Sequence, residues 1–196
     1  MKATDIMHPE DQKAIGALKK IPFIDEMCRS CMEIAYEKIY RGENLGMMVK
    51  VDNSYMPELY QDLKDVTKAI GINTPELFIY NDPVMNAFTF GETNPYVCVS
   101  SSLVEKMNRE ERKAILAHEC GHILCQHVLY GSVVETLRMI GEDFGIIGYT
   151  LTGPVKLALQ YWSRRSEYSA DRCAASVVAE RTFQASMLKL ALGLAD

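Results

Sequence analysis

The sequence has little of what nucleic-acid-binding or membrane-spanning proteins need. Its 21 basic residues are outnumbered by 26 acidic ones, which gives a formal charge of −5. A nucleic-acid-binding surface requires clustered Lys and Arg, so we expect no nucleic-acid partner. The uncharged run from Phe144 to Val155 contains three glycines and is shorter than the roughly 20 apolar residues of a spanning helix. We therefore expect no transmembrane segment, which leaves peripheral contact with a membrane open.

The chain is also poor in cysteine, with six in 196 residues. This is below the density of small disulfide-stabilised secreted domains, so we expect free thiols. Residues 1–10 lack the apolar stretch and cleavage site of a secretory signal, and the predicted location is cytoplasmic. Cys28 and Cys31 fall inside a predicted helix with no preceding strand, which argues against a redox site and for packing in the core.

What is present fits one domain over residues 1–196, because 48% hydrophobic residues are enough to fill a core. Apolar residues recur at helical spacing from Pro22 to Arg41, and again from Pro57 to a stop at Gly71. N-terminal helices are therefore predicted within residues 1–75. Short aromatic or β-branched runs, separated by turn residues, predict a small and largely antiparallel sheet within residues 76–101. The predicted strands are 77–80, 87–90 and 96–99.

Helical patterns return over residues 102–196, so the predicted fold class is α+β and mostly α-helical. Two pairs of residues in this part have the spacing of a helix cap with its reciprocal acid. They are Ser102 with Glu105, and Asn108 with Glu111.

Two long helices are predicted in the same part of the chain. The first begins at Asn108 and ends at Gly131. The second begins at Thr152-Gly153-Pro154 and reaches at least Val178. Between them, the glycine-containing residues 132–151 are predicted to form a loosely packed helical hairpin or a lid.

One short motif carries the chemistry. The run His118-Glu119-Cys120-Gly121-His122 has the HExxH pattern and lies in a predicted helix. Residues four apart on a helix project from one face and are about 6 Å apart, so both imidazoles can hold one zinc ion. Glu119 lies about 100° further round the helix, where a general base for a zinc-bound water belongs. The alternative, two histidines satisfied by ordinary hydrogen bonds, is disfavoured because the pattern is rare by chance.

A catalytic zinc needs a third protein ligand and an open fourth position. The five-residue spacing of His127 from His122 turns His127 away from the metal-binding face, so we expect it at the surface or behind the ligands. Cys125 is too far from His118 along the helix axis for one ion to reach both. We expect Cys125 to pack as a small apolar residue.

A pair of carboxylates remains as the candidate source of that ligand. Glu167 and Asp171 lie one helical turn apart on a later predicted helix. One of them could bind the metal while the other accepts the free N–H of a ligating histidine. The alternative is a solvated charged face, because arginines surround the pair at Arg164, Arg165 and Arg172.

Three blocks of sequence together resemble a known family. They are Asn86-Ala87-Phe88, the run from Glu110 to Ile123 that contains HExxH, and the run from Ser163 to Arg172. In this order and spacing they resemble the zinc metallopeptidases that include the heat-shock protease HtpX and the CAAX prenyl endopeptidase. Without flanking spanning helices, the chain is similar to the soluble branch.

The resemblance implies a gluzincin site with one zinc ion per chain. His118, His122 and Glu167 would be the zinc ligands, Glu119 the catalytic base and Asp171 a support of the ligand shell. The resemblance also implies a zincin-like sheet packed beside the HExxH helix.

A substrate-binding role is implied for Asn86, Ala87 and Phe88. In the family this stretch is an edge strand beside the cleft, to which an extended substrate adds as a further strand. The alternative for Asn86 is a plain turn residue after Pro83.

The predicted function is that of a zinc-dependent peptidase, and more finely an endopeptidase, acting on peptide or protein substrates. Two alternatives stay open at this point. One is a non-catalytic helical binding protein with a structural or relic metal site. The other is a zinc hydrolase of a non-peptide amide.

Overall fold

The computed structural model describes residues 1–35, 48–140 and 153–193. The predicted α+β class with mostly helical content is confirmed. Residues 36–41 of the first predicted helix and residues 141–151 of the predicted hairpin or lid lie outside the described residues. In chain order the elements are α1 (Ala3–Ile6), α2 (Pro9–Leu18), α3 (Ile24–Ala35), β1 (Met48–Val51), α4 (Pro57–Ile70), β2 (Glu76–Tyr80), β3 (Ala87–Phe90), β4 (Tyr96–Ser100), α5 (Ser101–Lys106), α6 (Arg109–Leu124), α7 (Val128–Ile140), α9 (Gly153–Val177) and α10 (Glu180–Leu192).

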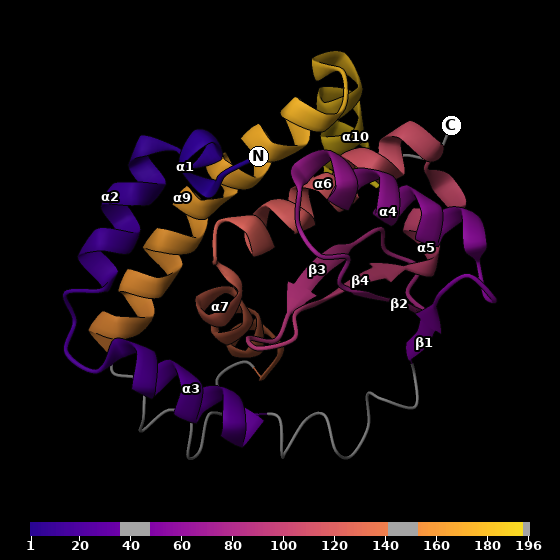
Figure 1. The fold of residues 1–196 in the computed structure, drawn as a ribbon. Coiled ribbons are helices and arrows are strands. Elements are labelled where there is room, and N and C mark those ends of the chain that lie inside the picture. Colours follow the sequence, from indigo (N-terminus) through magenta and orange to yellow (C-terminus); the bar gives the residue numbers. More distant parts are fainter. Residues whose placement is uncertain (36–47, 141–152, 194–196) are drawn as a thin grey trace.

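The sheet has the strand order β1-β2-β4-β3 (Figure 1). The β1–β2 and β3–β4 pairings are antiparallel and β2–β4 is parallel, so the prediction of a largely antiparallel sheet is confirmed. The sequence analysis did not predict β1, Met48–Val51, which is recognised by its pairing with β2. Within the described part of the chain β3 is an edge strand, and α6 and α7 pack against it.

The turn from β4 into α5 corrects one predicted cap. The cap of α5 is Ser100 rather than Ser102, because the strand runs directly into the helix. The Ser100 Oγ accepts a hydrogen bond from the backbone N–H of Leu103 at 3.2 Å. The same Oγ accepts the backbone N–H of Asn86 at 3.0 Å, and the Ser100 N–H donates to the Asn86 carbonyl at 2.9 Å. These bonds fix the backbone of Asn86 just before β3.

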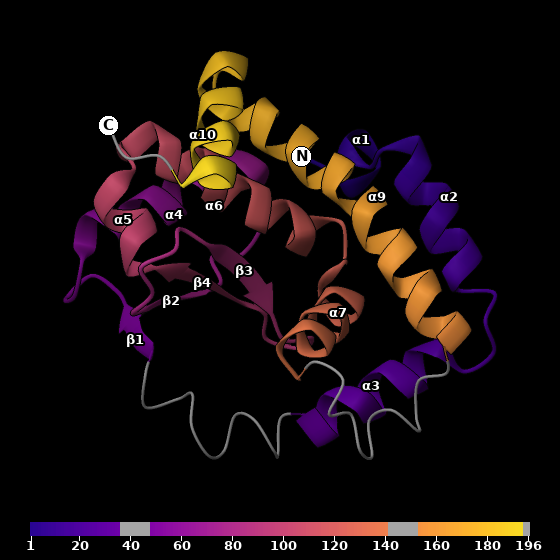
Figure 2. The ribbon, with the colours of Figure 1, turned by 180° about the vertical axis from the view of Figure 1, so that it is seen from behind.

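Helix α6 lies between the sheet and α9 (Figure 1 and Figure 2). Its predicted start is confirmed: Asn108 and Glu111 form a capping box. Its predicted end is wrong, because α6 stops at Leu124 and α7 begins at Val128. The break occurs at Gln126, which takes the left-handed backbone conformation with φ +59°. No glycine or proline marks this turn, so apolar spacing continues across it.

The second long helix is confirmed as α9, Gly153–Val177, which ends one residue before the predicted minimum. Helix α4 also ends as predicted, with Gly71 in the left-handed conformation at φ +85°. In residues 1–35, 48–140 and 153–193, the helices fall short of the length and apolar content of a membrane-spanning segment.

Two groups of buried apolar side chains stabilise the fold. The first lies between the sheet, α4 and α6 and reaches α9. The second joins α2, α3, α7 and α9 around Trp162, and it includes Cys28 and Cys31 as predicted. All six cysteines are free and buried. Figure 1 shows α2 alongside α9, so the N-terminal segment packs on the helix that carries Glu167.

Candidate metal centre

The close packing of α6 on α9 sets the geometry of the centre. Gly121, inside the HExxH motif, faces α9. A Cβ atom at this position would lie 2.8 Å from the Cβ of Cys173 and 3.0 Å from the Cα of Ala170. A larger residue would force the two helices apart. The glycine therefore lets α9 bring Glu167 to the histidines of α6.

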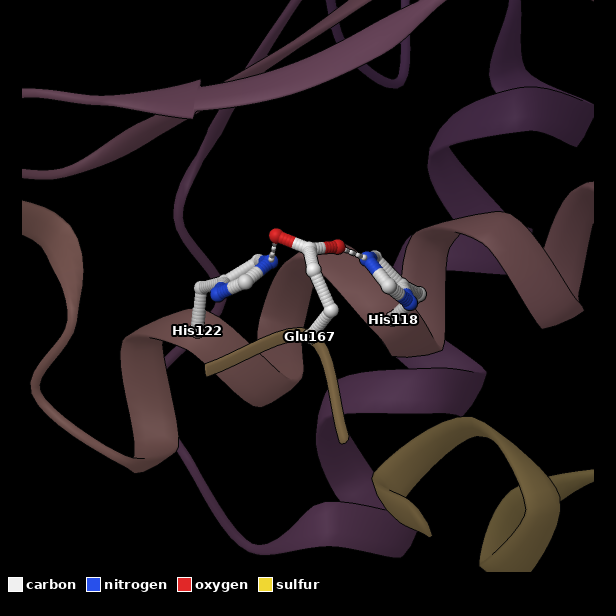
Figure 3. A group of neighbouring side chains, drawn as sticks. All are labelled: His118, His122 and Glu167. Atoms are coloured by element: carbon white, nitrogen blue, oxygen red, sulfur yellow. Dashed lines mark hydrogen bonds and ion pairs between the residues drawn. The ribbon is translucent and has the colours of Figure 1, made fainter. Parts of the chain in front are cut away.

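The Glu167 carboxylate lies between the two imidazoles (Figure 3). Its Oε2 is 3.1 Å from Nε2 of His118, and its Oε1 is 3.8 Å from Nε2 of His122. The three residues each offer one ligand atom, and these atoms lie within 4.8 Å of one another. Tetrahedral ligands 2.0–2.1 Å from zinc stand roughly 3.3 Å apart, so two imidazoles and a carboxylate in this arrangement fit a zinc ion.

The predicted supporting carboxylate also lies at the centre. Nδ1 of His118 is 3.0 Å from Oδ1 of Asp171, which stands one helical turn after Glu167. The two carboxylates of α9 thus face different nitrogens of one imidazole. Glu167 faces Nε2, the side shared with His122, and Asp171 faces the opposite side.

The carboxylates also determine the charge of His118. Burial opposes its protonation, but the hydrogen bonds with Asp171 and Glu167 outweigh burial and raise the pKa of His118 to about 10. Burial alone dominates at His122 and lowers its pKa to about 3. Burial disfavours the Glu167 anion, yet the bond with His118 holds the pKa of Glu167 below its usual value. A metal ion and a proton compete for Nε2 of His118, so metal binding would release a proton there.

His127 is buried behind the ligands and not at the surface, which corrects one of its two predicted positions. Since α6 ends at Leu124, the chain turns and the backbone N–H of His127 donates to the His122 carbonyl at 2.9 Å. Nδ1 of His127 then lies 3.1 Å from Nδ1 of His122. Cys125, in the same turn, is buried in the apolar core as predicted.

The turn brings His127 to a residue that the sequence analysis missed. Nε2 of His127 lies 2.9 Å from Oδ2 of Asp11, although the ring N–H does not point straight at that oxygen. Asp11 is a fully buried residue of α2. No motif marks it, because a single aspartate on an amphipathic N-terminal helix is ordinary.

Glu119 is held against the sheet. Its carboxylate Oε2 accepts a hydrogen bond from the Thr89 hydroxyl of β3 at 2.8 Å. Burial raises the pKa of Glu119, while the neighbouring His118 and the Thr89 bond act in the opposite direction. A carboxyl group whose pKa is raised in this way is suited to take up and return a proton near neutral pH. Thr89 is a second residue that the sequence analysis missed.

A cavity of about 280 Å³ opens between these groups and β3. It is lined on the helical side by His118, Glu119 and Glu167. On the other side it is lined by β3 and the residue before it, which include all three residues expected to contact substrate: Asn86, Ala87 and Phe88. The structure therefore brings every sequence-predicted site residue to one cavity or its immediate support.

Comparison with known proteins places this geometry in a family. The sequence pattern of Peptidase family M48 matches residues 54–193. The plastoglobule-localized metallopeptidase 48 of Arabidopsis thaliana is 29% identical over 98% of this chain and 57% of its own length. A protease HtpX homolog of Nitrosomonas europaea is 31% identical over 82% of this chain and 66% of its own length. Protease HtpX of Acinetobacter baumannii is 30% identical over 90% of this chain and 70% of its own length.

The chain thus spans less than two thirds of the first two of these relatives. The match to the family pattern covers most of this chain, and it contains both histidines of the HExxH motif, Glu119, Glu167 and Asp171. On that match, this chain belongs to Peptidase family M48.

Proposed function

We propose that this chain is a zinc-dependent peptidase, and more finely an endopeptidase, with one zinc ion held by His118, His122 and Glu167. The observation that carries the proposal is the meeting of three ligand atoms within 4.8 Å beside the buried carboxylate of Glu119. Membership of family M48 supports it, as do the names metallopeptidase and protease borne by the relatives.

The chemistry that zinc supplies in such a site is polarisation of a water molecule and of the scissile carbonyl. Glu119 accepts the proton that the attacking water loses, at its carboxylate oxygens. Because burial raises the pKa of Glu119, the carboxyl group can hold this proton and then give it to the nitrogen of the leaving amine. Asp171 keeps the His118 ring in place by accepting at Nδ1, which leaves Nε2 for the metal.

We further propose that an extended peptide binds along β3. This strand lies at the edge of the sheet in the described residues and borders the cavity. Backbone groups on such an edge can pair with a further strand. Ser100 hydrogen-bonds both the N–H and the carbonyl of Asn86 and so fixes its backbone. The exposed Asn86 side chain lies at the cavity, where it can contact substrate backbone.

The test combines metal analysis with a peptide-library digest. The wild-type chain should bind one zinc ion and cleave internal peptide bonds. Glu119→Gln should keep the metal and lose about 10²- to 10⁴-fold in kcat, the range of general-base catalysis. Full activity in Glu119→Gln would refute the assigned base.

The same experiment separates the alternatives. Zinc binding with no turnover of any library peptide, by the wild-type chain as by Glu119→Gln, would favour a non-catalytic binding protein. Hydrolysis of simple amides in the absence of peptide cleavage would favour a non-peptide amide as substrate. Release of terminal residues alone would refute endopeptidase action and retain the zinc peptidase.

A further inference from the structure

The two histidines of the HExxH motif are supported in different ways. His118 contacts a carboxylate directly, with Nδ1 at 3.0 Å from Asp171 Oδ1. His122 contacts another imidazole, with Nδ1 at 3.1 Å from Nδ1 of His127. The carboxylate on the His122 side is Asp11 of α2, which lies next to His127 and does not touch His122 directly.

We propose that His127 and Asp11 are positioning residues for the zinc site, which orient His122 through a relay of two imidazoles and a buried carboxylate. The inference rests on the proposed function, since it requires His122 to bind zinc. It extends the site to α2, which precedes residues 54–193, the part matched by the family pattern. The N-terminal helix would then be part of the metal site and not only a packing element.

The proton inventory of the relay is consistent. If a neutral His122 binds metal through Nε2, its single ring proton must be on Nδ1. Nδ1 of His127 must then be the acceptor, which leaves the His127 proton on Nε2. That nitrogen lies 2.9 Å from Oδ2 of Asp11, although its N–H is not aligned with that oxygen. Each contact has one proton, and the tautomer of His122 that can bind zinc is the one that the relay selects.

The surroundings fix Asp11 as the end of the relay. Its side chain is fully buried, and the Ser169 hydroxyl of α9 donates to its Oδ2. The Ser169 oxygen in turn accepts the backbone N–H of His8 at 2.9 Å. These contacts tie α2 to α9, so the carboxylate cannot turn away from His127 without breaking them.

The imidazole in the middle of the relay is held as well. The Trp162 ring packs edge-on against His127, with ring centroids 5.5 Å apart and planes at 82°. His127 is almost fully buried, although it borders the cavity beside His122. A ring fixed in this way can transmit the orientation of Asp11 to His122.

The experiment measures zinc affinity by competition with a chelator of known affinity, using the full chain. Removal of an outer partner of a ligating histidine typically costs 10- to 100-fold in metal affinity. We expect Asp11→Asn to raise the zinc dissociation constant by about this factor. The visible absorption of the Co²⁺-substituted protein should also change, because that signal reports ligand geometry.

Asp62→Asn is the matched control. Asp62 is as fully buried as Asp11, but it pairs with Arg109 at 2.7 Å and Arg112 at 2.9 Å between α4 and α6. We expect Asp62→Asn to lower the Tm while leaving the zinc affinity and the Co²⁺ spectrum unchanged. An equal loss of zinc affinity in Asp62→Asn would show that buried charge in general, and not the relay, is responsible, and would overturn the inference.

His127→Asn provides the second variant, and it answers the question if Asp11→Asn does not fold. It removes the link to Asp11, and should weaken zinc binding in the same direction. If the two residues act through one relay, the effects of Asp11→Asn and His127→Asn are not additive. The double variant should then have a zinc dissociation constant no higher than that of the more strongly affected single variant. Wild-type zinc affinity in a folded Asp11→Asn or His127→Asn protein would overturn the relay alone, whereas a wild-type chain that binds no zinc would overturn the proposed function.

Discussion

The cavity has two walls that differ in how their polar groups are satisfied. The helical wall includes His118, His122 and Glu167, which contact one another, and Asp171 supports His118 from behind this wall. The strand wall consists of residues 86–89, where the Asn86 side chain is exposed and β3 is a sheet edge in the described residues. Under the proposed function the two walls divide the work: the groups that contact one another hold the metal, and the open edge binds a peptide that must come and go.

Glu119 lies on α6, in the helical wall, and accepts a hydrogen bond from Thr89 of the strand wall. It therefore connects the two. If the division is correct, variants of the helical wall should change metal binding together with activity. Variants of the strand wall should change activity alone.

The largest effect is expected for His118→Ala on the helical wall. Without this imidazole one nitrogen ligand is lost, so the protein should lose its bound zinc during gel filtration. Peptide hydrolysis should then fall below detection. The measurement is zinc content by elemental analysis together with a peptide digest. Tyr55→Ala is the control, because Tyr55 is half exposed just before α4, outside the ligand group and the relay, and should leave both unchanged. Zinc retained in full by His118→Ala would contradict the proposed ligand set.

Asp171→Asn sharpens the helical side of the comparison. It removes the charge that faces Nδ1 of His118, and the zinc dissociation constant should rise by about 10- to 100-fold. Activity should recover when zinc is added in excess. Asp65→Asn is the control, since both side chains are 39% exposed and Asp65 pairs with Arg109 and Lys113 away from the site. If Asp171→Asn binds zinc as tightly as Asp65→Asn does, Asp171 does not support the metal site.

Thr89→Val tests the link between the walls. The change keeps the shape of the side chain and removes the hydroxyl that bonds to Glu119 at 2.8 Å. A hydrogen bond to a charged group contributes about 1.5–3 kcal/mol, so kcat should fall by roughly 10-fold or more. Zinc affinity should stay at the wild-type value, and Thr89→Ser should recover most of the activity. Weaker zinc binding in Thr89→Val would contradict the expectation that variants of the strand wall change activity alone.

The smallest effect is expected for Asn86→Ala on the strand wall. Loss of one side-chain hydrogen bond to a substrate backbone, worth about 0.5–1.5 kcal/mol, should raise KM by roughly 3- to 10-fold at nearly constant kcat. Zinc content should not change and any loss of Tm should be small, because Ser100 holds the backbone of residue 86, and the exposed side-chain amide makes one hydrogen bond, with Tyr80. Asn81→Ala, on the exposed turn before it, should leave KM unaltered.

The sequence predicted the elements of the site better than their connections. The capping box at Asn108 and the glycine stop at Gly71 are local signals, and both are confirmed. The break after Leu124 lacks such a signal, because Gln126 adopts a left-handed conformation with neither glycine nor proline nearby. The same break explains the wrong surface alternative for His127, since the rotation per residue is meaningful only within one helix.

Asp11 and Thr89 escaped prediction for a related reason. Each lies far along the chain from the residue it contacts, and neither belongs to a recognisable motif. In the same way, β1 became visible only through its pairing with β2.

By itself, the sequence determined which residue types could carry the chemistry, because HExxH fixes two imidazoles and a carboxylate on one helix by backbone geometry alone. It also made Glu167 and Asp171 a candidate pair through their one-turn spacing. Only the tertiary structure decided that Glu167 faces both histidines, and that His127 and Asp11 lie behind His122. Those contacts depend on how closely α6, α9 and α2 pack, and that distance is set by side chains such as Gly121 acting between helices.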